Sequence, residues 1–368
     1  MTRICAMCAA IHCLLACLIP GQALRAEPAA LNAAFDLVEA AIEKGEIPGA
    51  IALLSKDGKV IREEAYGLAD VEQKTSFTPR TICWVASITK PVTVAAAMKL
   101  VEQGRLGLDD PVEKHLPEFA EQKDKDGRHY SITVRQLMSH TSGLQANPPL
   151  RPDYFFEQEF LGRRIGEVAM ALAKTPLQFP PGSKTQYSNA APYVLARIIE
   201  LRSGKPFHEH VHQTILEPAG MRDSYFIIPA AKAGRTAVVY RDTKDKRVEF
   251  FHFNPNWKVT MTLPDGGLFS TPRDIARFLQ VFLDDDETVL ARSSVKAMRE
   301  QQTAGWGLGW ALEEKDSFHH SGSSGVSAWA DPTTGIVGVL FCQLQNPAKV
   351  DPLQSRFRQA VRAAYAAP

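Results

Sequence analysis

A serine stands one helical turn before a lysine at Ser87 and Lys90, in the stretch "CWVASITKPVTVAAAMKL". Residues three apart on a helix share a face, so the lysine Nζ can reach the serine Oγ. Burial and the positive end of the helix dipole both disfavour a charged lysine at this position. A neutral amine can take the proton of a serine hydroxyl, which can then attack a carbonyl carbon. The pair therefore predicts acyl-transfer chemistry, unless Ser87 is only an N-cap.

A second Ser-x-x-Lys match occurs at Ser293 and Lys296, so the spacing alone is a weak signal. The two matches differ in their surroundings. Ser87 is flanked by apolar residues and opens an apolar helix, which predicts that Ser87 and Lys90 are buried at a helix start. The later match is interpreted as an ordinary start of a surface helix.

Two further segments offer groups that such a reaction needs. Tyr187 and Asn189 lie in "PPGSKTQYSN", a loop before an apolar helix, where Tyr187 could be a second base. "HHSGSSG" contains His320, Gly322 and Ser323, and a glycine allows a strand edge to approach a ligand closely. The backbone N–H groups of Ser87 and Ser323 would form an oxyanion site. The simpler alternatives are a capped turn at Asn189 and a Gly/Ser-rich turn after His320.

The three segments Ser87–Lys90, Tyr187–Asn189 and His320–Gly322 have the order and approximate spacing of the penicillin-recognising serine hydrolases, which the chain resembles. That family includes class C β-lactamases, D-alanyl-D-alanine carboxypeptidases, D-aminopeptidases and family VIII esterases. "LGLDDPVEKHLPEF", "ITVRQLMSHTSGL", "DGGLFSTPRDIARFL" and "GWGLGW" also look like the family, and the resemblance extends from about residue 31 to the C-terminus.

The resemblance implies a two-step reaction through an acyl-enzyme. Ser87 is the expected nucleophile, and Lys90 and Tyr187 share the work of the general base. Asn189 is expected to hold a substrate amide or to orient the lysine. His320 is expected on a sheet edge beside the substrate, next to the oxyanion site.

His320 departs from the class C β-lactamases, which have a lysine at that position. A lysine is a permanent cation suited to a substrate carboxylate, whereas a histidine is mostly neutral at pH 7. We therefore expect an ester or peptide hydrolase with weak or absent β-lactamase activity. A true class C-like β-lactamase and a non-catalytic peptidoglycan-binding sensor are the alternatives.

The elements that must position these residues predict an α+β, β-lactamase-like fold. Strand patterns occur at both ends of the chain, and "LLSKDGKVI" predicts a hairpin that turns at Asp57-Gly58. Helical patterns dominate between them, so we expect an antiparallel sheet built from both chain ends and flanked by helices, with an all-helical middle region at about 105–225. We also expect the first helix to end at Gly49 and a strand in "GWGLGWALEE".

"HEHVH" is a rival site because His208, Glu209 and His212 match the H-E-x-x-H zinc motif. The extended motif fails, since Ile215 and Pro218 stand where a glycine and a third histidine are needed. We expect histidines on a solvated helix, with neither a metal nor a cofactor. His140, in "LMSHTSGL", is expected in a structural loop under the site.

The composition limits the remaining possibilities. The chain has 368 residues and a formal net charge of +1, which does not suggest a nucleic-acid partner. Residues 1–26 are typical of a signal peptide, leaving a domain at 27–368 without an integral membrane segment. We expect a periplasmic or secreted monomer that acts on a small ester, amide or peptide. A lipid anchor at Cys17 is less favoured, and Cys83 and Cys342 could form a disulfide or remain thiols.

Overall fold

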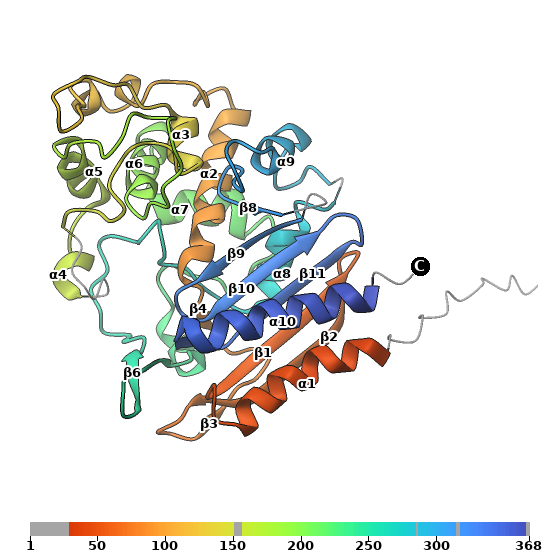
Figure 1. The fold of residues 1–368 in the computed structure, drawn as a ribbon. Coiled ribbons are helices and arrows are strands. Elements are labelled where there is room, and N and C mark those ends of the chain that lie inside the picture. Colours follow the sequence, from red (N-terminus) through yellow and green to blue (C-terminus); the bar gives the residue numbers. More distant parts are fainter. Residues whose placement is uncertain (1–28, 151–156, 285, 314–316, 366–368) are drawn as a thin grey trace, which may run out of the picture.

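A seven-stranded sheet joins the two ends of the chain in this computed structural model, which describes residues 29–150, 157–284, 286–313 and 317–365. All its pairings are antiparallel, in the order β3-β2-β1-β11-β10-β9-β8 (Figure 1). The sheet contains β1 (Gly49–Lys56), β2 (Lys59–Asp70), β3 (Thr75–Ser76), β8 (Ala311–Leu312), β9 (Phe318–Gly322), β10 (Val326–Asp331) and β11 (Ile336–Phe341). The central β1–β11 pairing confirms a sheet built from both chain ends. The proposed signal peptide lies outside the described residues.

The β1–β2 hairpin is confirmed where the sequence predicts it. Asp57 and Gly58 connect the strands, with φ values of 49° and 75°. Both angles lie in the left-handed region that a type I′ hairpin turn requires and that Asp-Gly tolerates. The turn sets the pairing of β1 with β2, which continues from Lys56 and Lys59 to Gly49 and Gly67.

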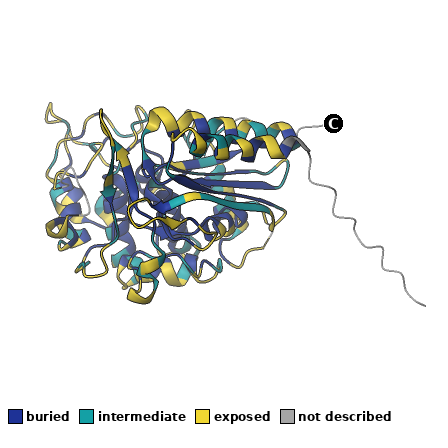
Figure 2. Ribbon diagram, turned by 90° about the horizontal axis from the view of Figure 1, so that it is seen from below, coloured by how far each residue is buried: buried dark blue, intermediate teal, exposed yellow. Residues whose placement is uncertain are grey.

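Both faces of the sheet are covered. Helices α1 (Ala29–Glu43) and α10 (Pro347–Tyr365) lie side by side on one face, and α8 (Pro272–Gln280) packs on the other (Figure 1). β1 shows the consequence, because Ala52 and Leu54 join the core under α1 and α10 while Ile51 and Leu53 join the opposite core. Successive strand residues point to opposite faces, so a strand covered twice is apolar throughout. In Figure 2 the strands are mostly dark blue beneath helices with yellow outer faces.

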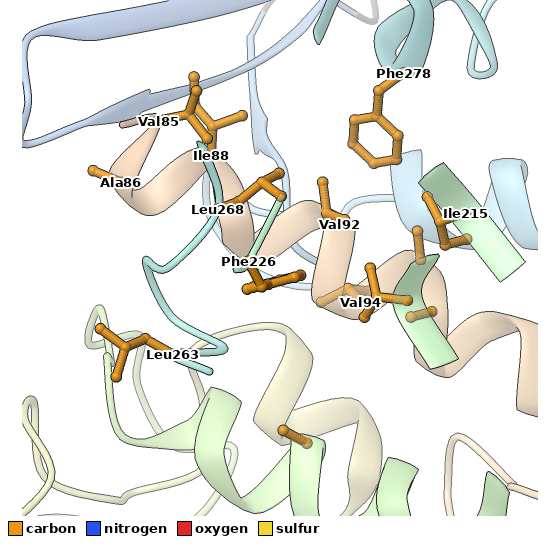
Figure 3. Close-up of a cluster of buried hydrophobic side chains, with 14 of the residues drawn as sticks. Val85, Ala86, Ile88, Val92, Val94, Ile215, Phe226, Leu263, Leu268 and Phe278 are labelled. Atoms are coloured by element: carbon orange, nitrogen blue, oxygen red, sulfur yellow. The ribbon is translucent and has the colours of Figure 1, made fainter. Parts of the chain in front are cut away.

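A helical region packs beside the sheet around α2 (Thr89–Glu102), which runs between the two parts (Figure 1). Its other helices are α3 (Val134–Met138), α4 (Gln158–Leu161), α5 (Ile165–Ala173), α6 (Ala191–Ser203) and α7 (Phe207–Val211), with α9 (Arg292–Arg299) later in the chain. Between 105 and 225 the described residues form no named strand, as predicted. Figure 3 shows Val85, Ile88 and Val92 at the start of α2, among apolar residues of neighbouring segments. The active-site candidate is therefore built on a fully packed helix start.

Short strands connect the remaining segments. β4 (Cys83–Trp84) pairs with β7 (Phe269–Ser270) just before α2. A small sheet contains β5 (Val239–Asp242), β6 (Arg247–Phe251) and β12 (Leu344–Gln345). None of the helices in the described residues is long and apolar enough to cross a membrane.

Two predicted boundaries are wrong. The first helix ends at Glu43 rather than at Gly49, because Gly45 turns the chain with a φ of 69°. Gly49 instead opens β1, where an added Cβ would lie 2.6 Å from the backbone nitrogen of Leu68. The predicted strand in "GWGLGWALEE" is limited to Ala311–Leu312, because Gly305 and Gly309 turn the chain with φ values of 77° and 79°.

Candidate active site

Ser87 and Lys90 face each other at the start of α2. Lys90 Nζ lies 3.0 Å from Ser87 Oγ and donates a hydrogen bond of 2.8 Å to the backbone carbonyl of Asp265. The lysine is only 2% exposed, and the serine is half-buried. The Asp265 carbonyl aims the amine at the serine. Ser87 makes no side-chain cap, so its hydroxyl is not used as an N-cap.

The backbone around Ser87 is held in an unusual conformation. Ser87 lies in a 3₁₀ turn (Ala86–Ile88) that leads directly into α2, and Ala86 has a φ of 45°. A left-handed alanine costs about 1 kcal/mol and persists only where its surroundings enforce it. Thr89 provides one such contact, because its hydroxyl donates to the Ala86 carbonyl and accepts from the Leu268 N–H. The helix start and the 264–268 segment therefore fix the serine together.

Tyr187 lies beside the Ser–Lys pair, with the face of its ring toward the lysine. Lys90 Nζ is 4.8 Å from the centroid of the tyrosine ring, a cation–π distance. In the described part of the chain, no hydrogen bond joins the Tyr187 hydroxyl to Ser87 or Lys90. His140 and Trp306 complete an aromatic wall, with centroids 4.6 Å and 5.8 Å from that of Tyr187.

Asn189 is in the same region but does not orient the lysine. Its side-chain amide donates to Asn147 Oδ1 at 2.7 Å, and its backbone N–H donates to the Ala146 carbonyl. The two hydrogen-bond partners of the Lys90 amine are Ser87 and Asp265. The Asp265 carbonyl therefore orients Lys90, a role that was one of the two expected for Asn189. The other role of Asn189, contact with a substrate amide, stays a prediction.

β9 places His320 and Gly322 against the start of α2. An added Cβ at Gly322 would lie 2.6 Å from the Val85 carbonyl oxygen, so only glycine permits this approach. The close contact is with the protein's own backbone rather than with a ligand. Ser323 follows in an exposed turn. Neither the Ser87 N–H nor the Ser323 N–H donates to another described residue, so both are available to an oxyanion.

His320 is a neutral side chain in this site. It is 4% exposed, and burial and the nearby Lys90 charge hold its pKa well below the usual value. Its Nδ1 lies 2.8 Å from the Ser321 carbonyl oxygen. Because a carbonyl only accepts, Nδ1 carries the proton and Nε2 has a free lone pair. The side chain thus offers an acceptor, not the cation that a lysine would supply.

The H-E-x-x-H segment forms no comparable centre. His208 is half-buried and His212 exposed, on α7 and the π-helical turn (His212–Leu216) that follows it. The expectation of a solvated helix is wrong for His210, which is buried and lies 3.1 Å from the Ala96 carbonyl oxygen. The described residues contain no group of three or more side chains arranged to hold a metal ion.

Cys83 and Cys342 are both buried free thiols. Burial raises the pKa of each, that of Cys342 to about 12, so neither is a nucleophile at neutral pH. The sequence left open whether these cysteines form a disulfide or remain thiols, and in the structure they are thiols.

The antiparallel α+β fold and a serine–lysine pair at the start of the central helix define a serine hydrolase of the β-lactamase type. The chain belongs to the β-lactamase family, whose model matches residues 34–363. Esterase EstB of Burkholderia gladioli is 28% identical over 91% of this chain and 95% of its own length.

Solved structures agree with this assignment. EstCE1, described as a hydrolase with promiscuous acyltransferase activity, has a TM-score of 0.79 at 23% identity and covers 90% of this chain and 98% of its own. A penicillin-binding protein homologue from Caulobacter crescentus has a TM-score of 0.74 at 25% identity, covering 92% and 98%. These comparisons confirm three predictions from the sequence: the family resemblance, the fold class and the class of enzyme.

Three features of the site have only faint sequence signals. The Asp265 carbonyl belongs to the backbone and is 175 positions from the lysine that it holds. Trp306 lies in a segment that the sequence analysis predicts as a strand, so its place in the site was not predicted, although its flanking glycines signal a turn. His140 was expected merely to support the site, yet it packs directly on Tyr187.

Proposed function

We propose that this serine hydrolase is a carboxylesterase-type enzyme that cleaves small, uncharged esters or related amides. The observation that carries the proposal is the buried Lys90 amine 3.0 Å from the Ser87 hydroxyl. Ser87 Oγ bonds to the substrate carbonyl carbon while its proton passes to Lys90. The backbone N–H groups of Ser87 and Ser323 are suited to the resulting oxyanion.

Breakdown of this intermediate releases the alcohol, and hydrolysis of the acyl-enzyme then releases the acid. The bond from carbonyl carbon to leaving oxygen breaks, and that oxygen takes the proton, from Lys90 directly or through the Tyr187 hydroxyl. A water molecule next attacks the acyl carbon and gives up a proton to the same groups. The bond from the acyl carbon to Ser87 Oγ then breaks, and that proton passes to Oγ as the acid leaves. No cofactor enters this scheme.

The preference for uncharged substrates is supported by the walls of the site. His320 is neutral where a class C β-lactamase would have a lysine, and Tyr187 and Trp306 present aromatic faces. A substrate carboxylate beside β9 would lose its water without gaining a permanent cation in exchange. Esters without a carboxylate avoid that cost. The similarity to an esterase over nearly the whole chain points the same way.

We also propose that the enzyme works in the periplasm or outside the cell. The support is the composition of residues 1–26, with an early arginine, an apolar run and small residues near Ala26.

The test is a direct comparison of substrates. Residues 27–368 and their Ser87→Ala variant are assayed with p-nitrophenyl butyrate, nitrocefin and a D-alanyl peptide, and intact mass is measured after fluorophosphonate treatment. We expect ester turnover and one adduct for the wild type, and neither for the variant. Faster turnover of nitrocefin than of the ester would identify a β-lactamase instead. An unlabelled, inactive wild type that binds peptidoglycan fragments would identify a non-catalytic sensor.

A further inference from the structure

Tyr187 depends on its neighbours for its position. The segment 185–188 has no regular secondary structure, and Tyr187 is 37% exposed. A half-exposed side chain on an irregular segment can adopt several rotamers, so contacts to neighbouring residues must select one. For a residue expected to move a proton, an error of about 1 Å can cost about a hundredfold in rate.

His140 makes a separate contact with each of three consecutive residues of that segment. Its backbone carbonyl accepts a hydrogen bond of 2.8 Å from the Gln186 N–H. Its Nδ1 accepts one of 3.2 Å from the Ser188 N–H. Between these two bonds, its ring lies against the Tyr187 ring at 4.6 Å, with an interplanar angle of 34°.

We infer that His140 is a positioning residue for Tyr187, and that it holds the phenol ring beside Lys90. The inference rests on the proposed function, because it concerns a step of that reaction. Trp306 supports the arrangement from another side, with its ring 4.6 Å from that of His140.

The protonation of His140 suits this role. A backbone N–H can only donate, so Nδ1 must be unprotonated and the proton must lie on Nε2. The residue is 4% exposed, and burial and the charge of Lys90 lower its pKa to about 3. Lys90, Tyr187 and His320 are the titratable groups around it, and none of them supplies the negative charge that would favour an imidazolium. The histidine therefore stays neutral and keeps its acceptor.

The backbone of His140 also indicates a specialised position. Its φ is 60°, a left-handed conformation that is uncommon for residues other than glycine, although histidine, asparagine and aspartate adopt it more often than the rest. In this conformation, both the backbone carbonyl and the ring of His140 contact the segment 186–188. It also makes asparagine the best replacement, because an asparagine tolerates this φ and its Oδ1 can stand in for Nδ1.

The experiment compares two replacements of nearly equal shape, His140→Asn and His140→Leu. Asparagine keeps the acceptor for the Ser188 N–H, whereas leucine removes it. We expect kcat for p-nitrophenyl butyrate to fall by about ten- to a hundredfold in the leucine variant, with KM changed by less than about threefold. The asparagine variant should recover most of that loss. Thermal unfolding shows whether each variant is folded at the assay temperature.

Thr185→Val is the matched control. Thr185 lies on the same segment, and its hydroxyl lies 2.6 Å from that of Thr303. Loss of this hydrogen bond should leave kcat within about twofold. A fall as large as that of His140→Leu would mean that any loosening of the segment is harmful, which would overturn the specific role of His140.

A second measurement does not depend on activity. Each protein is labelled with 3-fluorotyrosine, and the ¹⁹F signal of Tyr187 is identified by its absence in Tyr187→Phe. We expect one signal at the same position in the wild type and His140→Asn, and a shifted or split signal in His140→Leu. An unchanged signal in the leucine variant, or a wild-type kcat in that variant, would overturn the inference. If the wild type has no esterase activity, the proposed function fails, and the fluorine signal alone decides whether His140 positions the ring.

Discussion

The two Ser-x-x-Lys segments have the same spacing and opposite environments. Lys90 lies in the first turn of α2, is 2% exposed, and contacts Ser87 and a backbone carbonyl. Lys296 lies in the last turn of α9, where the helix dipole favours a cation, and both it and Ser293 are exposed. Identical spacing therefore gives a reactive pair at one helix end and an ordinary surface at the other, and the difference is burial and dipole direction.

The largest expected effect separates the two serines. Ser87→Ala removes the proposed nucleophile and should lower kcat/KM for an ester by at least about a thousandfold. Ser293→Ala changes a solvated residue and should leave kcat/KM within about twofold. Steady-state assays of both variants beside the wild type provide the comparison. Retention of a tenth of the activity in Ser87→Ala would place the nucleophile elsewhere.

The two lysines should differ by nearly as much. Lys90→Met keeps the length of the side chain but removes the proton acceptor, so we expect kcat to fall by about 10²- to 10⁴-fold. Lys296→Met should have no measurable effect on kcat. The folded state should tolerate Lys90→Met, because the change removes an amine from the unfavourable end of a helix dipole. Thermal unfolding and kcat are measured together, and normal activity in Lys90→Met would refute its role as base.

This contrast explains how much of the molecule the sequence could predict. Local signals sufficed for the β1–β2 turn at Asp57-Gly58 and for the Ser87–Lys90 pair, because each depends on residues a few positions apart. Strand patterns at both chain ends then predicted the sheet, and the family motifs predicted the class of enzyme. Apolar flanks correctly separated the buried lysine from the exposed one.

The sequence did not predict the contacts that join segments far apart in the chain, above all those made by backbone groups. The Asp265 carbonyl, the aromatic wall with Trp306 and the contacts of His140 join segments far apart in the chain. Carbonyl oxygens carry no side-chain identity, so no residue type signals them. Gly322 shows the same limit, since its glycine was recognised but the Val85 carbonyl that requires it was not.

Gly322 tests whether burial at the start of α2 depends on close strand packing. An alanine Cβ there would lie 2.6 Å from the Val85 carbonyl oxygen, so β9 must move away. We expect kcat to fall by about tenfold in Gly322→Ala, because the oxyanion site shifts with the strand. Gly234→Ala is the matched control, since nothing lies within 4 Å of the added Cβ. Equal activities in the two variants would show that the strand end has room to adjust.

The last expected effect concerns stability rather than activity, and it extends the contrast between buried and exposed residues to histidine. The folded-state pKa of His140 is lowered to about 3, below the value of about 6.5 expected in an unfolded chain. The unfolded state therefore binds more protons below about pH 6.5, and the free energy of unfolding falls as pH is lowered toward about 3. At pH 5 this histidine should account for a loss of about 2 kcal/mol relative to neutral pH.

Denaturant unfolding at pH 7 and pH 5 measures this loss. His140→Asn removes the titrating group, so the difference between the two pH values should shrink by about 2 kcal/mol. His320, whose pKa is also held low, keeps its own share of the pH dependence in that variant. If His140→Asn has the same pH dependence as the wild type, then His140 is protonated freely in the folded state, and its Nδ1 cannot be the permanent acceptor of the Ser188 N–H.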